Sequence, residues 1–205
     1  MYRISSKLVK ENWDNVRDLS DSMGVLLSTW NSAFYRARKL NYSQIESAVN
    51  RNKRKLNECR IRNIISVSDL DIAEIEPLYN DMLSALEIKK TGIDSENGVR
   101  IIKSPVSAAK ALHLLCPDFF PLWDRSIANA YGCKWKSTED SFDSYLRLMI
   151  KCEKQVIDLS KEGKTPLVLH DVTILKLIDE YNYVMFTLKG TSAENPIAVY
   201  TRKAL

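Results

Sequence analysis

The sequence predicts an all-α protein that folds as a single globular domain of about eight helices. Apolar residues recur at steps of three and four along most of the chain, which is the spacing of one helix face. Short capping sequences, in which a Ser or an Asp stands before an apolar run, open several of these segments. The chain has only six glycines and six prolines, too few for the many turns of an all-β sandwich, and we find no convincing pair of strands.

The size and composition of the chain are those of a soluble globular protein. Its 205 residues are 45% apolar and 27% charged, and a chain of this length can bury a sizeable core. We therefore expect one domain over residues 1–205; an alternative division has a core of residues 100–189 and a variable lobe of residues 1–100 and 190–205. No run approaches roughly 18 apolar residues and no signal peptide is evident, so we expect no membrane segment and a cytoplasmic location.

The amino-terminal part of the chain predicts two helices. The first spans about residues 5–21, and Gly24 separates it from a second that continues beyond Phe34. Trp30 lies on the apolar face of the second helix, where aromatic residues usually belong to the core. The alternative is that Trp30 or Tyr35 reaches a binding pocket.

Two further helices follow before the middle of the chain. The capping box Ser43–Glu46 predicts the start of one, and its basic middle, residues 50–55, is either a solvated face or one that tracks phosphates. A capping box at Ser68–Asp71 opens the next helix, which either kinks at Pro77 or restarts there. The turn residues of segment 91–98 predict a loop.

The carboxy-terminal third predicts two more helices, the first of them long. Ser137–Asp140 caps the first, and Asp171 caps the second, which runs through Leu188. The apolar residues of the first helix, at alternating steps of three and four, are Phe142, Tyr145, Met149, Cys152, Val156 and Leu159. The tail from Gly190 is polar, although residues 197–200 could add a short packed segment.

The charges of the chain are unevenly distributed, although the net charge is only +4. Residues 36–63 hold nine Lys or Arg against two Glu, and the balance reverses over residues 69–96. One interpretation is a face turned toward a polyanion. The other is two helix faces whose charges complement each other across a packing contact.

The four cysteines, at positions 59, 116, 133 and 152, are far apart and form no Cys-x-x-Cys pair. This spacing lacks the pattern of a metal site, and scattered cysteines in a cytosolic protein are usually small core residues. We therefore expect no metal, no iron–sulfur cluster and no cofactor.

The functional prediction depends on residues 104–124. Ser107 stands before an almost unbroken run of Ala and Leu, long enough for three helical turns. Two prolines punctuate the turn that follows. Asp124 then precedes a short helix that stops at Gly132, so its side chain is expected to cap the first turn of that helix.

This segment resembles the active-site core of the helix-hairpin-helix DNA glycosylases, and most of all their adenine-excising branch. That family has a small-residue helix and then a hydrophobic-Phe-Pro-x-x-Asp turn, whose Asp caps the next helix and serves in catalysis. Phe120–Asp124 matches the turn, and Ser107-Ala108 matches the start of the preceding helix without a gap. The match covers about residues 100–132. Arg100–Val106 replaces the family's Leu-Pro-Gly-Val-Gly motif, so the hairpin is degenerate.

The resemblance implies that Asp124 is the catalytic carboxylate. Breaking an N-glycosidic bond builds positive charge on the sugar, and a carboxylate fixed beside the anomeric carbon stabilises that transition state. In members that also cut the DNA backbone, a Lys opening the preceding helix forms a Schiff base with the sugar. Val106 stands at that position, which favours a monofunctional enzyme that uses water, although Lys103 and Lys110 are near in sequence.

Candidate binding residues lie near Asp124 in the sequence or on the second helix. A base flipped out of duplex DNA needs aromatic or apolar walls. Trp123 is the first candidate for such a wall, with Tyr131 and Trp30 behind it. The candidates for phosphate contacts around the degenerate hairpin are Arg100, Lys103, Ser104 and Arg125.

Ser107, Lys110 and His113 form a polar stripe at a spacing of three on the otherwise apolar helix. Lys110 and His113 are candidates for substrate contacts. For His113, the interpretation we favour is that the stripe is a solvent-facing edge.

We therefore expect a monomeric DNA glycosylase that flips a modified or damaged base out of double-stranded DNA and leaves an abasic site. The wider class includes bacterial defence enzymes that excise bulky modified cytosines from phage DNA, which makes glucosylated hydroxymethylcytosine a candidate substrate. The alternative is a non-catalytic helical module that binds DNA or protein and has lost the site. The degenerate hairpin favours this alternative, and the intact Pro-x-x-Asp turn favours the enzyme.

Overall fold

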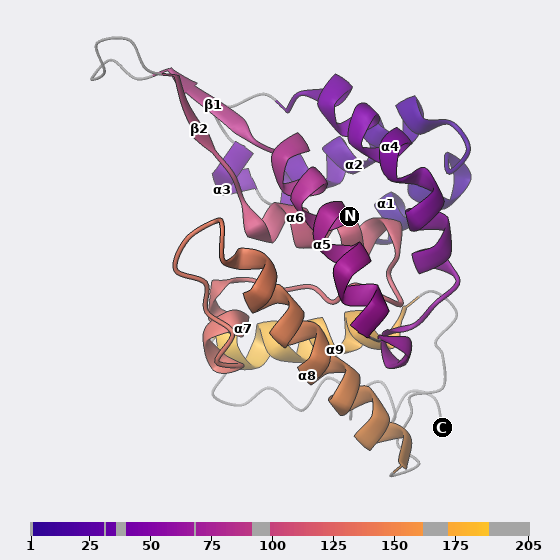
Figure 1. Ribbon diagram of the computed structural model, residues 1–205, viewed down its shortest axis with the longest axis vertical. Coiled ribbons are helices and arrows are strands. Elements are labelled where there is room, and N and C mark those ends of the chain that lie inside the picture. Colours follow the sequence, from indigo (N-terminus) through magenta and orange to yellow (C-terminus); the bar gives the residue numbers. More distant parts are fainter. Residues whose placement is uncertain are drawn as a thin grey trace.

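The computed structural model of the protein confirms the all-α class. It describes residues 2–30, 32–35, 40–67, 69–91, 99–161 and 172–188. Within these ranges the chain is helical apart from one two-stranded sheet and the connecting turns (Figure 1).

The elements follow one another in the order shown in Figure 1. The α-helices are α1 (Tyr2–Glu11), α2 (Val16–Trp30), α3 (Ser32–Tyr35), α4 (Tyr42–Arg60), α5 (Asp69–Ala85), α6 (Pro105–Leu115), α7 (Arg125–Ala130), α8 (Ser141–Lys161) and α9 (Ile174–Asn182). A 3-10 turn, η1 (Ile64–Ser66), precedes α5, and a π-helical turn, η2 (Tyr183–Thr187), continues α9. The strands are β1 (Ile88–Thr91) and β2 (Val99–Ile102).

The predicted helix break at Gly24 is wrong. The first break lies at residues 12–15, and α2 runs through Gly24 to Trp30. Gly24 is buried, and a Cβ at this position would overlap the ring of Tyr42 at the start of α4. The glycine therefore leaves room for the ring of Tyr42 on α2, and it does not end the helix.

The start of α4 and the path of α5 also differ from prediction in detail. Asn41 caps α4, and its side chain accepts a hydrogen bond from the backbone N–H of Gln44. The observed N-cap therefore lies two residues before Ser43, the predicted one. Helix α5 continues through Pro77 without restarting. The other predicted capping box includes Ser68, which lies outside the described residues.

The basic segment 36–63 and the acidic segment 69–96 meet in part where α4 packs against α5. Arg51 pairs with Asp81 at 3.3 Å, and Lys55 pairs with Glu74. These pairs support the second interpretation of the charge pattern for these residues. Arg54 remains 88% exposed, with Glu58 of its own helix as its partner.

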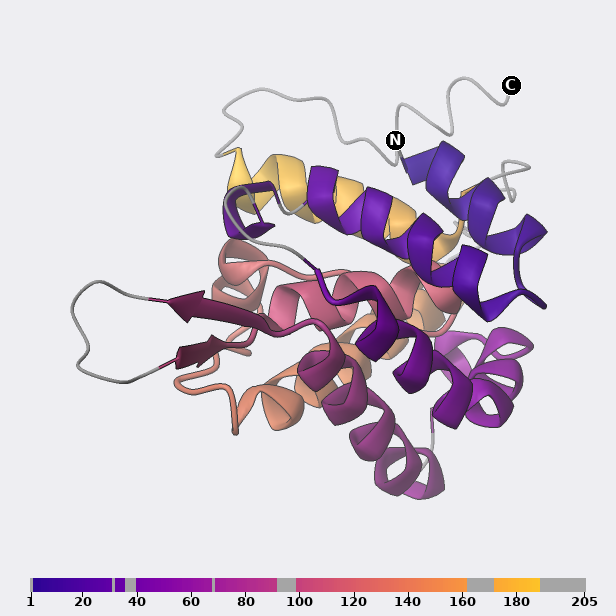
Figure 2. The same cartoon turned by 90° about the horizontal axis from the view of Figure 1, so that it is seen from above.

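The prediction that the chain has no pair of strands is wrong. Strands β1 and β2 pair antiparallel, with Ile88 opposite Ile102 and Lys90 opposite Arg100. They project as a ribbon from the helical body (Figures 1 and 2). Strand β2 includes the first three residues of the segment Arg100–Val106, and of the predicted loop, residues 91–98, only Thr91 is described, as the last residue of β1.

Helix α6 is the centre of the core and contacts α1, α2 and α5. Its apolar residues Ala108, Ala109, Ala111, Leu112, Leu114 and Leu115 are all buried. Helix α8 packs against η1 and α5. Its buried face holds the residues that the helical repeat predicted, namely Phe142, Tyr145, Met149, Cys152 and Val156, while Leu159 is half-buried. The predicted solvent-facing edge of α6 is wrong for His113, which has no exposed surface.

Helix α9 begins after Thr173, whose hydroxyl accepts a hydrogen bond from the backbone N–H of Lys176. The predicted cap Asp171 and the tail from Gly190 lie outside the described residues. All four cysteines are buried and none of them forms a disulfide, as expected of small core residues. Across the described ranges, no helix combines the length and the hydropathy that crossing a membrane requires.

Candidate active site

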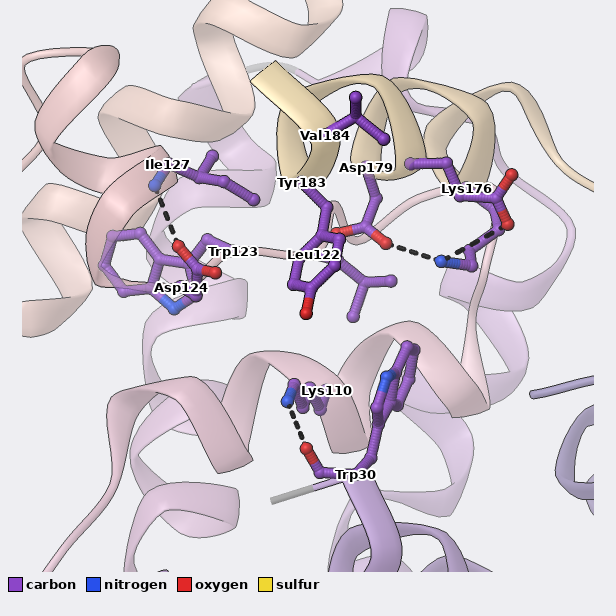
Figure 3. A pocket seen from close by; sticks show the side chains of 11 residues that line it. Trp30, Lys110, Leu122, Trp123, Asp124, Ile127, Lys176, Asp179, Tyr183 and Val184 are labelled. Atoms are coloured by element: carbon purple, nitrogen blue, oxygen red, sulfur yellow. Dashed lines mark hydrogen bonds and ion pairs between the residues drawn. The ribbon is translucent and has the colours of Figure 1, made fainter. Parts of the chain in front are cut away.

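An open cavity of about 590 Å³ lies between the carboxyl end of α2, the middle of α6, the start of α7 and the last helix, α9 with its continuation η2 (Figure 3). This volume is within the range of about 300–1,000 Å³ that is usual for small-molecule sites. The lining residues are Trp30, Lys110, Leu122, Trp123, Asp124, Ile127, Lys176, Asp179, Glu180, Tyr183 and Val184.

Asp124 lies on the wall of this cavity as the N-cap of α7, as the sequence predicted. Its backbone is extended, and its Oδ1 accepts a hydrogen bond of 2.8 Å from the N–H of Ile127. Its Oδ2 accepts a second hydrogen bond, 2.7 Å long, from the hydroxyl of Thr187. Both carboxylate oxygens are therefore held, and the side chain stays partly exposed to the cavity.

Lys110 reaches the cavity from the second turn of α6. Its ammonium donates a hydrogen bond of 2.9 Å to the carbonyl of Trp30 and lies 5.1 Å from the centre of the Trp30 ring. Burial lowers the pKa of Lys110, and the charges of Asp179 and Asp124 oppose that shift. The amine is thus a polar group on a largely apolar wall.

Helix α9 places an ion pair on the opposite side of the cavity from Asp124 (Figure 3). The ammonium of Lys176 lies 2.5 Å from Oδ2 of Asp179 and 3.7 Å from the carboxylate of Glu180. It also lies 5.3 Å from the centre of the Trp30 ring. Burial raises the pKa of Asp179, and the contact with Lys176 counteracts part of that rise.

Trp123 contributes to the cavity wall, but its ring belongs to the core. The side chain is 1% exposed and its Nε1–H donates to the carbonyl of Pro105 at 3.3 Å. The ring packs against Trp135 at 4.5 Å and against Tyr145 at 5.1 Å between ring centres. The aromatic side chains with room to meet a ligand are those of Trp30 and Tyr183, and Tyr183 is 46% exposed.

Tyr131 and His113, which the sequence grouped with the substrate contacts, are not among the lining residues. Tyr131 caps the end of α7, and its hydroxyl bonds to the side chains of Gln155 and Asn182. His113 is enclosed in the core, where Nε2 faces the hydroxyl of Tyr2 at 2.9 Å and Nδ1 faces the carbonyl of Phe120 at 2.7 Å. Since a carbonyl only accepts, Nδ1 carries the proton, and the Tyr2 hydroxyl donates to Nε2.

The four predicted phosphate contacts have different environments. Ser104 is buried, and its hydroxyl caps α6 by accepting from the N–H of Ser107. This structural role explains its presence without a phosphate. The ammonium of Lys103 donates to the hydroxyl of Ser84, Arg100 is a residue of β2, and the exposed Arg125 lies 5.3 Å from the ring of Trp135.

The residues that α9 and its continuation η2 bring to the cavity were not predicted from the sequence. These residues are Lys176, Asp179, Glu180, Tyr183, Val184 and, through its contact with Asp124, Thr187. The spacing of Lys176 and Asp179 resembles an ordinary ion pair on a helix surface, so only its burial marks it as unusual. Nothing in the local sequence shows that this helix lies across from α6.

Within the described ranges, no group of three or more His, Cys, Asp or Glu side chains is arranged to hold a metal ion. Comparison with known proteins found no matching family model, no matching curated protein and no matching solved structure. The interpretation of the site therefore depends on its own geometry.

The cavity combines three kinds of groups. Trp30 and Tyr183 provide aromatic surfaces, Lys110 and the Lys176–Asp179 pair provide hydrogen-bond donors and acceptors, and Asp124 provides a fixed negative charge. An aromatic, polar molecule that develops positive charge near Asp124 fits all three.

Proposed function

We propose that the protein is a DNA N-glycosylase and that the flipped nucleoside enters the cavity beside Asp124. The observation that carries this proposal is the position of Asp124, which is held by two hydrogen bonds on the wall of a cavity of about 590 Å³. A carboxylate sealed in the core, with no space for a nucleoside beside it, would have excluded such an enzyme. The match of Phe120–Asp124 to the catalytic turn of the helix-hairpin-helix glycosylases also supports the proposal.

The carboxylate acts on the sugar. As the bond between the anomeric carbon and the base nitrogen breaks, its electron pair leaves with the base and the sugar becomes cationic. The negative charge of Asp124 stabilises this cation and orients the water whose oxygen bonds to the anomeric carbon. The water then gives up a proton, the base takes one up, and an abasic site remains.

The rest of the cavity suits the departing base. Trp30 and Tyr183 offer faces on which a flipped base can stack. Lys110, Lys176 and Asp179 offer donors and acceptors to its edge or to a polar substituent. The resembled class includes bacterial defence enzymes that excise bulky modified cytosines, so glucosylated hydroxymethylcytosine is the substrate we propose to test first, with defence against phage DNA as the corresponding role.

We propose a water-dependent reaction without cleavage of the DNA backbone. Val106, at the position of the Schiff-base lysine in the resembled family, lies in the first turn of α6. Lys110 lines the cavity one turn later, so it is the residue to examine for a covalent path. Borohydride trapping should yield no protein–DNA adduct; a trapped adduct that is lost in Lys110→Met would contradict the water-only mechanism.

The test of the function is an abasic-site assay. Duplexes that each carry one modified or damaged base, glucosylated hydroxymethylcytosine among them, are incubated with the protein, treated with alkali and examined for strand breaks. Asp124→Asn is the matched control, because Asn caps a helix about as well as Asp does. We expect breaks at the modified base with the natural protein and at least a 100-fold slower reaction with the variant. Equal cleavage by both proteins would refute the assignment of Asp124.

The second candidate function is a non-catalytic helical module that binds DNA or protein. The observation that favours it is the absence of the family's glycine motif from the segment Arg100–Val106, whose first three residues belong to strand β2. The same panel separates the two candidates. Binding to duplex DNA without abasic product on any modified base, phage DNA included, would support the module and end the enzymatic proposal.

A further inference from the structure

Asp124 has a hydrogen bond that its role as a helix cap does not require. The cap consists of the bond from the N–H of Ile127 to Oδ1, at 2.8 Å. The second bond, from the hydroxyl of Thr187 to Oδ2 at 2.7 Å, comes from a residue 63 positions further along the chain. The carboxylate is therefore fixed by two separate elements, and only one of them is its own helix.

The element that carries Thr187 has an uncommon geometry. After Asn182 the last helix widens into the π turn η2, which the N–H of Leu188 closes by donating to the carbonyl of Tyr183 at 2.9 Å. Single π turns are rare in proteins, and those that occur often lie at functional sites. Here the first residue of the turn, Tyr183, lines the cavity, and the last, Thr187, contacts Asp124.

The π turn is also attached to the far end of α7. The carboxamide oxygen of Asn182 lies 3.0 Å from the hydroxyl of Tyr131, and the ring of Phe186 meets the Tyr131 ring edge-on at 6.2 Å. These two contacts hold η2 against α7, and neither of them involves Thr187. The bond from the Thr187 hydroxyl to Asp124 is therefore not needed to attach η2 to α7.

We propose that Thr187 is a positioning residue for Asp124. This inference rests on the proposed glycosylase function. The cap bond alone leaves Oδ2 free to move as the side chain rotates, and the hydroxyl removes that freedom. Asp124 then meets the developing sugar cation in one orientation, which is the condition for a fixed charge to accelerate the reaction.

The inference is tested with Thr187→Val, which keeps the shape and removes the donor, and with Thr187→Ser, which keeps the donor. The substrate is the duplex with glucosylated hydroxymethylcytosine, or the best duplex of the panel. We expect Thr187→Val to lower kcat roughly 10- to 100-fold with an unchanged KM, since a hydrogen bond to an ionised group is lost. Thr187→Ser should stay within about threefold of the natural protein.

Thr173→Val is the matched structural control. It removes a threonine hydroxyl from the other end of the last helix, where the hydroxyl accepts from the N–H of Lys176 and donates to the carbonyl of Pro117 at 3.1 Å. It should lower the melting temperature slightly and leave kcat unchanged. All assays are run well below the lowest melting temperature in the series, with Thr187→Ala as a second donor-free variant in case Thr187→Val is poorly folded.

The outcomes separate the inference from the function. In one outcome the natural protein releases the base, Asp124→Asn does not, and the kcat of Thr187→Val is unchanged or higher. That result refutes the positioning role of Thr187 and leaves the glycosylase function standing. A Thr187→Ser variant as slow as Thr187→Val refutes it as well. If the natural protein releases no base from any duplex, the function fails and the inference fails with it.

Discussion

The two sides of the cavity differ in how they are encoded. On one side, the structure of residues 104–132 is determined by neighbours in the sequence. Ser104 caps α6, Asp124 caps α7, and Gly132 takes a positive φ just after α7 ends. On the other side, the last helix contributes Lys176, Asp179 and Tyr183, whose importance depends wholly on where that helix packs.

The difference teaches which properties of a site are local. A carboxylate at the start of a helix can be recognised in sequence because capping involves residues within one turn. The partner of that carboxylate cannot, since Thr187 follows 63 positions later and reaches Asp124 through a π turn. We therefore expect the two sides to respond differently to substitution, and the predictions below begin with the largest effect.

The largest effect on stability is expected at Lys176. The side chain of Lys176 is 9% exposed, and its ammonium neutralises the carboxylate of Asp179, whose side chain is 14% exposed. Lys176→Met leaves that carboxylate buried without its partner, which should lower the free energy of unfolding by about 3–5 kcal/mol. Urea denaturation measures the change.

The matched control for this pair is the double variant Lys176→Met with Asp179→Leu. Replacing a buried ion pair by apolar residues is often neutral, so the double variant should recover most of the lost stability. A double variant as unstable as the single one would show that the pair supports the fold through packing and not through charge.

His113 should make stability depend on pH. Burial lowers the pKa of His113 to about 3, whereas in the unfolded chain it is about 6.5. Between these values the unfolded chain binds a proton that the folded protein does not, so the free energy of unfolding falls as the pH drops below about 6.5. The slope from this one group is at most about 1.4 kcal/mol per pH unit.

The comparison that isolates this group is His113→Gln, because Gln can donate to the carbonyl of Phe120 and accept from Tyr2 without titrating near neutral pH. Unfolding of both proteins is followed from pH 7.5 to 5, above the range in which most carboxylates titrate. An equal slope in the two proteins would contradict the buried, neutral state of His113.

A smaller effect is expected at Tyr183, on the last helix. Removal of the ring in Tyr183→Ala should weaken binding of a duplex with a flipped base by about 1–3 kcal/mol, the value of one base–aromatic stack. Met185→Ala is the control on the same turn, since Met185 is 39% exposed and does not line the cavity. Fluorescence titration measures both affinities, and equal losses would exclude stacking on Tyr183.

The fold was predictable where the periodicity of the sequence and the packing agree. The buried face of α8 follows the apolar repeat of residues 142–156 residue by residue. Gly24 shows where the prediction fails, because its role is to admit Tyr42 against α2 and such a contact between distant residues leaves no local trace. Strand β1, Ile88–Thr91, was missed because four residues with two lysines do not alternate clearly enough to predict a strand.

The candidate site was predictable to a similar extent. Asp124, Lys110, Trp123 and Trp30 do line one cavity. His113 was assigned incorrectly because a polar residue at helical spacing is the same in sequence whether water or a buried carbonyl is its partner. Only the contacts with Tyr2 and Phe120 decide between them.

The most direct test of the central claim compares binding with base release in one experiment. The natural protein and Asp124→Asn are each titrated with a duplex that carries one glucosylated hydroxymethylcytosine, and the free base is then quantified over time by mass spectrometry. We predict similar affinities and a release rate at least 100-fold lower for the variant. Equal release by both proteins, or no release by the natural protein from this or any other modified duplex, would contradict the account.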